Sequence, residues 1–135
     1  MNVLETDHWC LLIPTEWWAE HDDDLVRIAD REGVGEIELT TLCREEGVVT
    51  AAEIEQLARE ESPEVETWSS VRVGAFSGQC GAFAEDDAQL REWYVSAGPV
   101  LLYITYVCDL ENAGMDDAAV DEILATLVAA DTEAS

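Results

Sequence analysis

The stretch from Arg91 to Asp109, REWYVSAGPVLLYITYVCD, constrains the fold of this chain more than any other. From Val100 to Val107, nearly every residue is apolar, on both alternating faces of an extended strand. A strand with one face in water alternates apolar and polar residues, so this pattern predicts a strand that is covered on both faces. Residues 91–96 indicate a second strand, and Ala97-Gly98-Pro99 a tight turn between the two. We therefore expect an antiparallel hairpin at the centre of a sheet.

Shorter apolar runs between turn residues predict the other strands. These runs are His8–Ile13, Leu25–Ala29, Glu36–Cys43, Trp68–Phe76 and Gln79–Ala84. In the third strand, Ile37 and Leu39 share one face, and Glu36 and Glu38 share the other. The segment between the first two strands, PTEWWAEHDDD, is expected to turn the chain.

Two helices are expected. Thr50 and Glu53 form a capping box, in which each side chain satisfies a backbone N–H group at the start of a helix. This helix carries an apolar stripe of Ile54, Leu57 and Ala58, and it should stop before Ser62-Pro63 because the residue before proline avoids helical angles. The second helix should run from Asp117 to Ala129, with Asp116 or Asp117 as its N-cap, and residues 131–135 should fray.

The element order is therefore βββ-α-ββββ-α, in a single domain over residues 1–135. The fold class is α/β in the α+β sense, with a mainly antiparallel sheet of about six to seven strands. Because the central strand is apolar on both faces and two helices are available, a layered sandwich is the natural solution.

The charge of the chain excludes whole classes of partner. There are 31 acidic residues and six basic ones, which gives a net charge of −25. All six basic residues are arginines. Such a field repels nucleic acids and anionic membranes, so we expect neither as a partner. The negative charge agrees with a hydrated surface suited to a salty cytoplasm, or with a partner protein that is basic. Mimicry of nucleic acid agrees with it less well. No apolar run is long enough to span a membrane, and no signal peptide is visible, so we expect a cytoplasmic protein.

The residues that could support catalysis or metal binding are few. The two histidines are His8 and His21. The segment formed by His21, Asp22, Asp23 and Asp24 offers ligands to a divalent cation, but it lacks the pattern of a calcium loop, and a solvated turn is the preferred interpretation. The four cysteines, Cys10, Cys43, Cys80 and Cys108, have no zinc-site spacing. Cys80, in GQCGAF, most resembles a nucleophile, yet we expect it to be a small strand residue. We assign no catalytic residue, cofactor or metal.

The tryptophans offer the clearest candidates for a binding surface. Trp9, Trp68 and Trp93 fall within predicted strands and should lie in the core. Trp17 and Trp18 are adjacent, so they cannot point the same way, and one of them can remain exposed at the first turn. Exposed aromatic residues are enriched in protein-binding surfaces. Trp17 and Trp18 are therefore the candidates for a partner-binding or ligand-binding site.

Several segments together resemble one known family. They are WCLLIPTEWW, GVGEIELTT, VRVGAFSG, REWYVSAGPVLLYITYVC and VDEILATL, which follow one another as in small bacterial proteins of the PsbP-like superfamily. That superfamily is an α/β/α sandwich on an antiparallel sheet, and it includes an extrinsic photosystem subunit and the Mog-type nuclear-import factor that binds Ran. The resemblance implies an α/β/α sandwich and a role in protein binding here, but it transfers no functional residue.

We therefore expect a non-catalytic protein-interaction module with a strongly acidic, salt-adapted surface. Two alternatives remain open. One is an immunity-type inhibitor of a basic effector protein. The other is a small ligand-binding protein or enzyme with a pocket near Trp17 and Trp18. The oligomeric state is not predicted.

Overall fold

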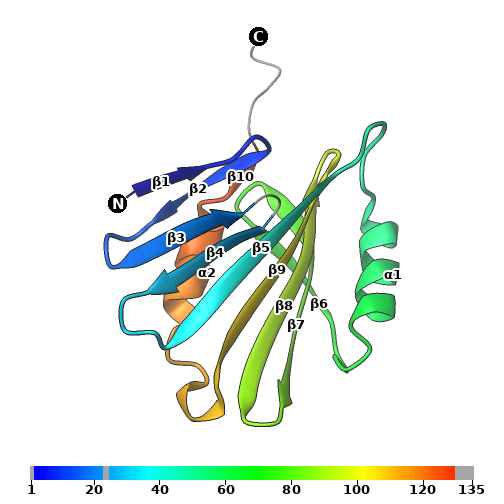
Figure 1. Ribbon diagram of the computed structural model, residues 1–135. Helices are drawn as coiled ribbons and strands as arrows, with labels where there is room; N and C mark the ends of the chain where they lie inside the picture. The colour runs from blue at the N-terminus through cyan, green and yellow to red at the C-terminus, as the bar shows by residue number, and fades with distance from the viewer. Residues whose placement is uncertain (1, 23–24, 130–135) are drawn as a thin grey trace.

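The computed structural model describes residues 2–22 and 25–129 and contains a large antiparallel sheet, a small sheet and two α-helices (Figure 1). The predicted frayed tail, 131–135, lies outside the described residues. The strands are β1 (Asn2–Glu5), β2 (Trp9–Ile13), β3 (Trp17–Asp22), β4 (Leu25–Asp30), β5 (Gly35–Cys43), β6 (Ser69–Val73), β7 (Phe76–Glu85), β8 (Ala88–Ala97), β9 (Val100–Asp109) and β10 (Val128–Ala129). The helices are α1 (Ala51–Glu61), the 3₁₀ turn η1 (Leu110–Asn112) and α2 (Asp117–Ala125). The protein is thus a sheet-rich α+β fold.

The predicted central hairpin lies at the centre of the large sheet. The strand order is β3-β4-β5-β9-β8-β7-β6, so β9 has three strands on either side. Strands β8 and β9 pair in antiparallel register from Ala97–Val100 to Ala88–Asp109, and Gly98 in the turn has a φ of 59°. Glycine adopts this angle without steric cost, which explains the tight turn.

The two faces of β9 contact different parts of the protein. On one face Leu102, Ile104 and Tyr106 are buried in the main core, which also contains residues of α2 and β2. On the other face Leu101 is buried in a smaller cluster with Ile54 and Ala58 of α1. The apolar pattern of the strand therefore reflects cover on both faces, as expected. Figure 1 shows α1 and α2 on different sides of the molecule.

The first predicted strand does not belong to the large sheet. It forms β2, which pairs with β1 on one edge and β10 on the other in a separate three-stranded sheet. Trp9 is fully buried beneath this sheet, and its indole Nε1 donates a hydrogen bond to the hydroxyl of Thr41 at 2.8 Å. This bond joins the small sheet to β5 of the large sheet.

The predicted element order, βββ-α-ββββ-α, is wrong because it lacks β1, β3 and β10, and several predicted boundaries are also wrong. The segment predicted to turn the chain contains β3, which pairs with β4 along its whole length, from Trp17–Asp30 to Asp22–Leu25. The single strand predicted over Trp68–Phe76 is interrupted at Gly74, whose φ is 61° and which separates β6 from β7. Trp68 itself precedes β6 and is half-buried, so it is not a strand residue of the core.

The C-terminal helix is shorter than predicted. It ends at Ala125, where the hydroxyl of Thr126 donates to the carbonyl of Ile123 at 2.7 Å and accepts from the backbone N–H of Leu12 at 2.9 Å. The chain then leaves the helix and forms β10 against β2. Contacts with a distant strand therefore end this helix before its apolar stripe is complete.

The first helix has the predicted ends. The hydroxyl of Thr50 accepts from the N–H of Glu53, and the carboxylate of Glu53 accepts from the N–H of Thr50, which is the expected capping box. The helix ends at Glu61, before Ser62, whose hydroxyl is 2.8 Å from that of Tyr94. This buried hydrogen bond holds the end of α1 on β8.

Candidate functional site: an apolar groove beside helix α1

Helix α1 covers only part of its face of the large sheet. It lies mainly against β7 and β8, and its buried side chains are Ile54 and Ala58. On the same face of the neighbouring strands, Leu42 of β5 pairs with Leu101 of β9. Leu101 is buried, whereas Leu42 is 55% exposed because α1 does not reach it. Leu42 and Leu101 therefore form an apolar surface between the helix and β5.

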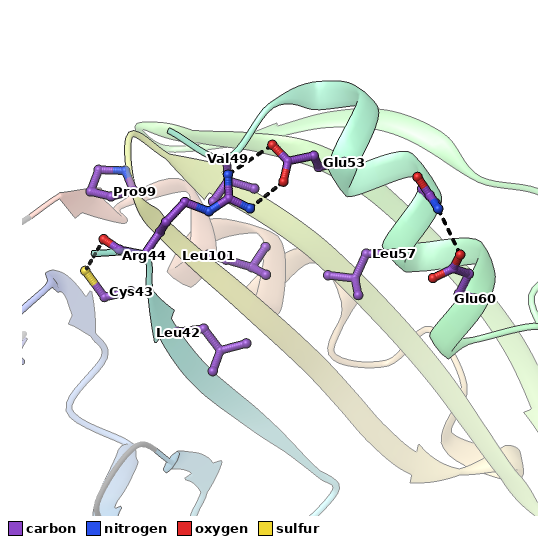
Figure 2. Close-up of a pocket in the computed structure, with 10 residues that line it drawn as sticks. Leu42, Cys43, Arg44, Val49, Glu53, Leu57, Glu60, Pro99 and Leu101 are labelled. Atoms are coloured by element: carbon purple, nitrogen blue, oxygen red, sulfur yellow. Dashed lines mark hydrogen bonds and ion pairs between the residues drawn. The ribbon is translucent and has the colours of Figure 1, made fainter. Parts of the chain in front are cut away.

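This apolar surface is the floor of a groove with a volume of about 420 Å³. The groove is lined by Leu42, Cys43, Arg44, Val49, Glu53, Gln56, Leu57, Glu60, Pro99 and Leu101. Figure 2 shows Leu42 and Leu101 on the strands and Leu57 on α1, with the space of the groove between them. Its size is within the range of small-molecule and side-chain binding sites.

The upper end of the groove is held by Arg44. Both of its terminal nitrogens donate to the carboxylate of Glu53, and one also donates to the carbonyl of Val48 at 2.9 Å. The Arg44 guanidinium, with further hydrogen bonds from Thr50, lowers the pKa of Glu53 from about 4.5 to about 2. The backbone N–H of Arg44 also donates to the carbonyl of Pro99 at 2.9 Å. These bonds join β5, the turn before β9 and the start of α1 into one rim.

The surroundings of the groove are acidic. The segment from residue 43 to residue 61 contains six glutamates and two arginines. One of these arginines, Arg44, is already paired with Glu53, and Glu60, near the other end of α1, accepts a hydrogen bond from Gln56 at 3.0 Å. The groove therefore combines an apolar floor with a negatively charged rim.

The predicted partner-binding tryptophans lie elsewhere. Trp17 is 7% exposed and packs in the main core, whereas Trp18, on the opposite face of β3, is 42% exposed. Trp18 pairs with Ala29, and Ala29 pairs with Glu36 of β5, so these three side chains are on one face of the sheet. Leu42 is on the same face, because it is an even number of residues from Glu36 along β5. Trp18 is thus on the uncovered part of the sheet but does not line the groove.

The histidine and metal candidates are only partly described. His21 and Asp22 are the last residues of β3, whereas Asp23 and Asp24 lie outside the described residues. His21 and His8, distant in sequence, line one polar pocket of about 370 Å³ together with Glu5, Asp7 and Thr41. Within residues 2–22 and 25–129, no three histidine, cysteine, aspartate or glutamate side chains are arranged to hold a metal ion.

Cys80 is a strand residue, in β7 opposite Trp93. Burial raises the pKa of its thiol, although the guanidinium of Arg91 acts in the opposite direction. A thiol with a raised pKa is a poor nucleophile at neutral pH. Cys10, Cys43, Cys80 and Cys108 form no disulfide with one another.

Sequence reasoning did not find the groove. Its residues come from β5, the loop after it, α1 and the turn before β9, and only the packing of α1 brings them together. The one available signal was Leu42. It is an apolar residue on the face of β5 that otherwise carries Glu36 and Glu38.

Among the described residues, no helix is long and apolar enough to cross a membrane.

Comparison with known proteins supports the fold alone. No protein-family model matches the chain, and no curated protein matches it. A crystal structure from Bacteroides thetaiotaomicron VPI-5482 is similar, with a TM-score of 0.67 and 15% sequence identity. The similarity covers 93% of this chain and 46% of that chain, so this chain spans about half the length of its structural neighbour. The chain thus has the fold of one part of a larger bacterial protein.

Proposed function

We propose that this chain is a non-catalytic protein-interaction module, and that the groove beside α1 receives an apolar side chain of a basic partner segment. The observation that carries the proposal is Leu42, a large apolar side chain that is 55% exposed at the edge of a formed groove. Apolar anchors that enter such pockets contribute most of the binding energy at protein interfaces.

Charge identifies the chemistry of the partner. The net charge of −25 and the six glutamates around the groove favour a segment that carries lysine or arginine beside its apolar anchor. An acidic partner would be repelled. The uncovered sheet face beyond the groove, which includes Trp18 and Val107, extends the surface available to such a segment.

We further infer that the fold is the α/β/α sandwich of the PsbP-like superfamily, with a strongly acidic, salt-adapted surface. The placement of α1 and α2 in different clusters on the two faces of β9 supports this inference. The immunity-type role is a narrower version of the same function, since its basic effector would satisfy the same partner chemistry. The enzyme or ligand-binding alternative beside Trp17 and Trp18 stays a prediction.

The experiment uses a defined probe, a peptide with one leucine flanked by lysines. Its binding is followed through the NMR signals of the methyl groups of Leu42, Leu57 and Leu101. We expect these signals to shift and Leu42→Asn to weaken binding at least tenfold, which is about 1.4 kcal/mol. The matched control is Val3→Asn, since Val3 is similarly exposed, at 59%, but lies on the small sheet.

Two results would contradict the proposal. One is equal binding of the peptide to wild type and to Leu42→Asn. The other is equal binding of a peptide in which the lysines are replaced by glutamates.

A further inference from the structure

Glu92 is an acidic side chain in the interior of the protein. It is 4% exposed and lies on β8, directly opposite Gly81 of β7. Its Oε2 atom accepts a hydrogen bond from the hydroxyl of Tyr103 at 3.0 Å. Its Oε1 atom is fully buried and has no hydrogen-bond partner within the part of the chain that the structure describes. A carboxylate oxygen removed from water without a replacement partner is energetically unfavourable.

Tyr103, which contacts this carboxylate, belongs to an aromatic cluster with Tyr94 and Trp68. Tyr94 stacks at a tilt on Tyr103, with ring centroids 4.8 Å apart, and packs edge-on against Trp68 at 5.6 Å. Trp68 lies over Gly81, the cross-strand partner of Glu92, and a side chain at position 81 would contact its ring. The Nε1 atom of Trp68 is the second buried polar atom without a partner among the described residues. Aromatic faces together with a carboxylate form a typical binding site for an organic cation.

The arginines that form ion pairs in the described residues are paired with acidic residues other than Glu92. These pairs are Arg27 with Glu36 and Glu38, Arg44 with Glu53, and Arg91 with Asp117 and Asp121. The sequence contains no lysine. No lysine of this chain can therefore supply an ammonium group to Glu92.

Tyr103 lies beside the groove and contacts Glu92. Leu101, at the floor of the groove, and Tyr103 are successive residues on the same face of β9. Tyr103 is half-buried and packs against the cluster of Leu101 and Tyr94, and its hydroxyl contacts Glu92. Burial and the adjacent Glu92 carboxylate raise the pKa of Tyr103, so its hydroxyl stays protonated and donates to the carboxylate. Tyr103 thus contacts both the cluster that contains Leu101, at the floor of the groove, and the carboxylate of Glu92.

We propose that Glu92 Oε1 receives the primary ammonium group of a lysine side chain, whose methylene groups lie along Leu57 and Leu101. Entry requires the half-buried ring of Tyr103 to turn aside. Lysine fits better than arginine, because its ammonium is compact and its three donors can serve one carboxylate oxygen while the ring faces stabilise its charge. This proposal depends on the proposed function only for the source of the lysine.

The test uses n-butylammonium, which has the methylene chain and ammonium group of lysine and needs no protein partner. Thermal melts are recorded with increasing n-butylammonium chloride, at an ionic strength held constant with sodium chloride. We expect the melting temperature of wild type to rise with butylammonium. We also expect the half-saturating concentration to be at least tenfold higher in Glu92→Gln. The control is Glu38→Gln, on the same sheet face but paired with Arg27, which should respond as wild type does.

A second measurement on wild type does not depend on the stability of any variant. Butylammonium should shift the indole N–H signal of Trp68 and the ring signals of Tyr94 and Tyr103, with little change elsewhere. An equal response in wild type and Glu92→Gln would overturn the proposal. So would an equal effect of neutral 1-butanol, or shifts spread over the acidic surface. Failure of the leucine peptide to bind, with the butylammonium response intact, would contradict the proposed function alone.

Discussion

The ring of Tyr106 lies directly against the backbone of Gly35, so that a Cβ atom at position 35 would overlap the ring and its hydroxyl. Tyr106 cannot easily move away, because it is 2% exposed and its hydroxyl donates to Asp116 Oδ2 at 2.8 Å. Asp116 is the N-cap residue of α2, but its side chain makes no cap hydrogen bond and serves Tyr106 instead. This contact fixes the start of β5 and the start of α2 relative to β9.

Gly35→Ala is therefore expected to destabilise the protein. Overpacking costs roughly 1–3 kcal/mol, whereas replacing a strand glycine by alanine gains only roughly 0.5–1 kcal/mol. The net loss is measured as a lower free energy of unfolding in urea. In a Tyr106→Leu background, which removes the ring, the same substitution should cost much less. An equal cost in both backgrounds would show that Tyr106 is not the cause.

Ile104→Asp should prevent folding. Ile104 is fully buried in the middle of β9, where an unpaired charge costs about 3–5 kcal/mol and the lost apolar packing about 2–5 kcal/mol more. The sum is comparable to the whole stability of a domain, about 5–15 kcal/mol. The control is Val107→Asp on the same strand, because Val107 is 39% exposed on the opposite face. Circular dichroism melts distinguish the two variants. A cooperative melt of Ile104→Asp close to that of wild type would contradict the central position of β9.

The sequence predicted the centre of the fold better than its edges. Val100–Val107 is apolar on both faces, rich in β-branched and aromatic residues and preceded by a turn, so the sequence pattern predicts a covered strand at this position. Strand β3 was missed because its second half, Glu20-His21-Asp22, is polar. Its pairing with β4 stabilises it despite that composition. Val128 fits the stripe of the last helix, and only the contact between Thr126 and Leu12 ends that helix earlier.

The candidate site was less predictable because it depends on packing. Leu42 was placed in a strand, but its exposure follows from the position of α1 over β7 and β8, which no local pattern specifies. Glu92 falls within the predicted central hairpin, but the sequence does not show that its carboxylate is buried. Because Trp17 and Trp18 are adjacent, the sequence predicts that they point to opposite faces and that one can be exposed. The exposed residue is Trp18.

The Arg44–Glu53 pair predicts a specific pH dependence. The pKa of Glu53 is lowered to about 2, chiefly by the hydrogen bond from Arg44. Because the folded state binds this proton less readily than the unfolded state, the pair stabilises the protein above pH 4.5, and its contribution is lost as pH falls toward 2. The difference in unfolding free energy between wild type and Glu53→Gln should therefore shrink over that range. The control is Glu55→Gln on the same helix, which should not show this change with pH. If the difference between wild type and Glu53→Gln stayed constant from pH 4.5 to pH 2, the assignment would be contradicted.

The strongest consequence of the composition concerns salt. The 25 uncompensated negative charges on this domain are closer together than the Debye length, which is about 10 Å at 0.1 M salt. Folding brings these charges together, so they repel one another more in the folded state than in the expanded chain. The arginines cannot cancel this repulsion, since there are six of them and 31 acids, and exposed pairs contribute only about 0–1 kcal/mol.

We therefore expect the melting temperature to rise steeply between 20 mM and 1 M sodium chloride, because the Debye length falls to about 3 Å at 1 M. Mild acidification from pH 7 toward pH 5 should also stabilise, by discharging part of the surface. Thermal melts at 20 mM, 200 mM and 1 M salt test this, with sucrose as a non-ionic control for exclusion from the surface. A flat or falling melting temperature would contradict the prediction, because it would mean that a bound cation or partner already neutralises the acids. In that case the cation-binding interpretation of residues 21–24 would become the first one to test.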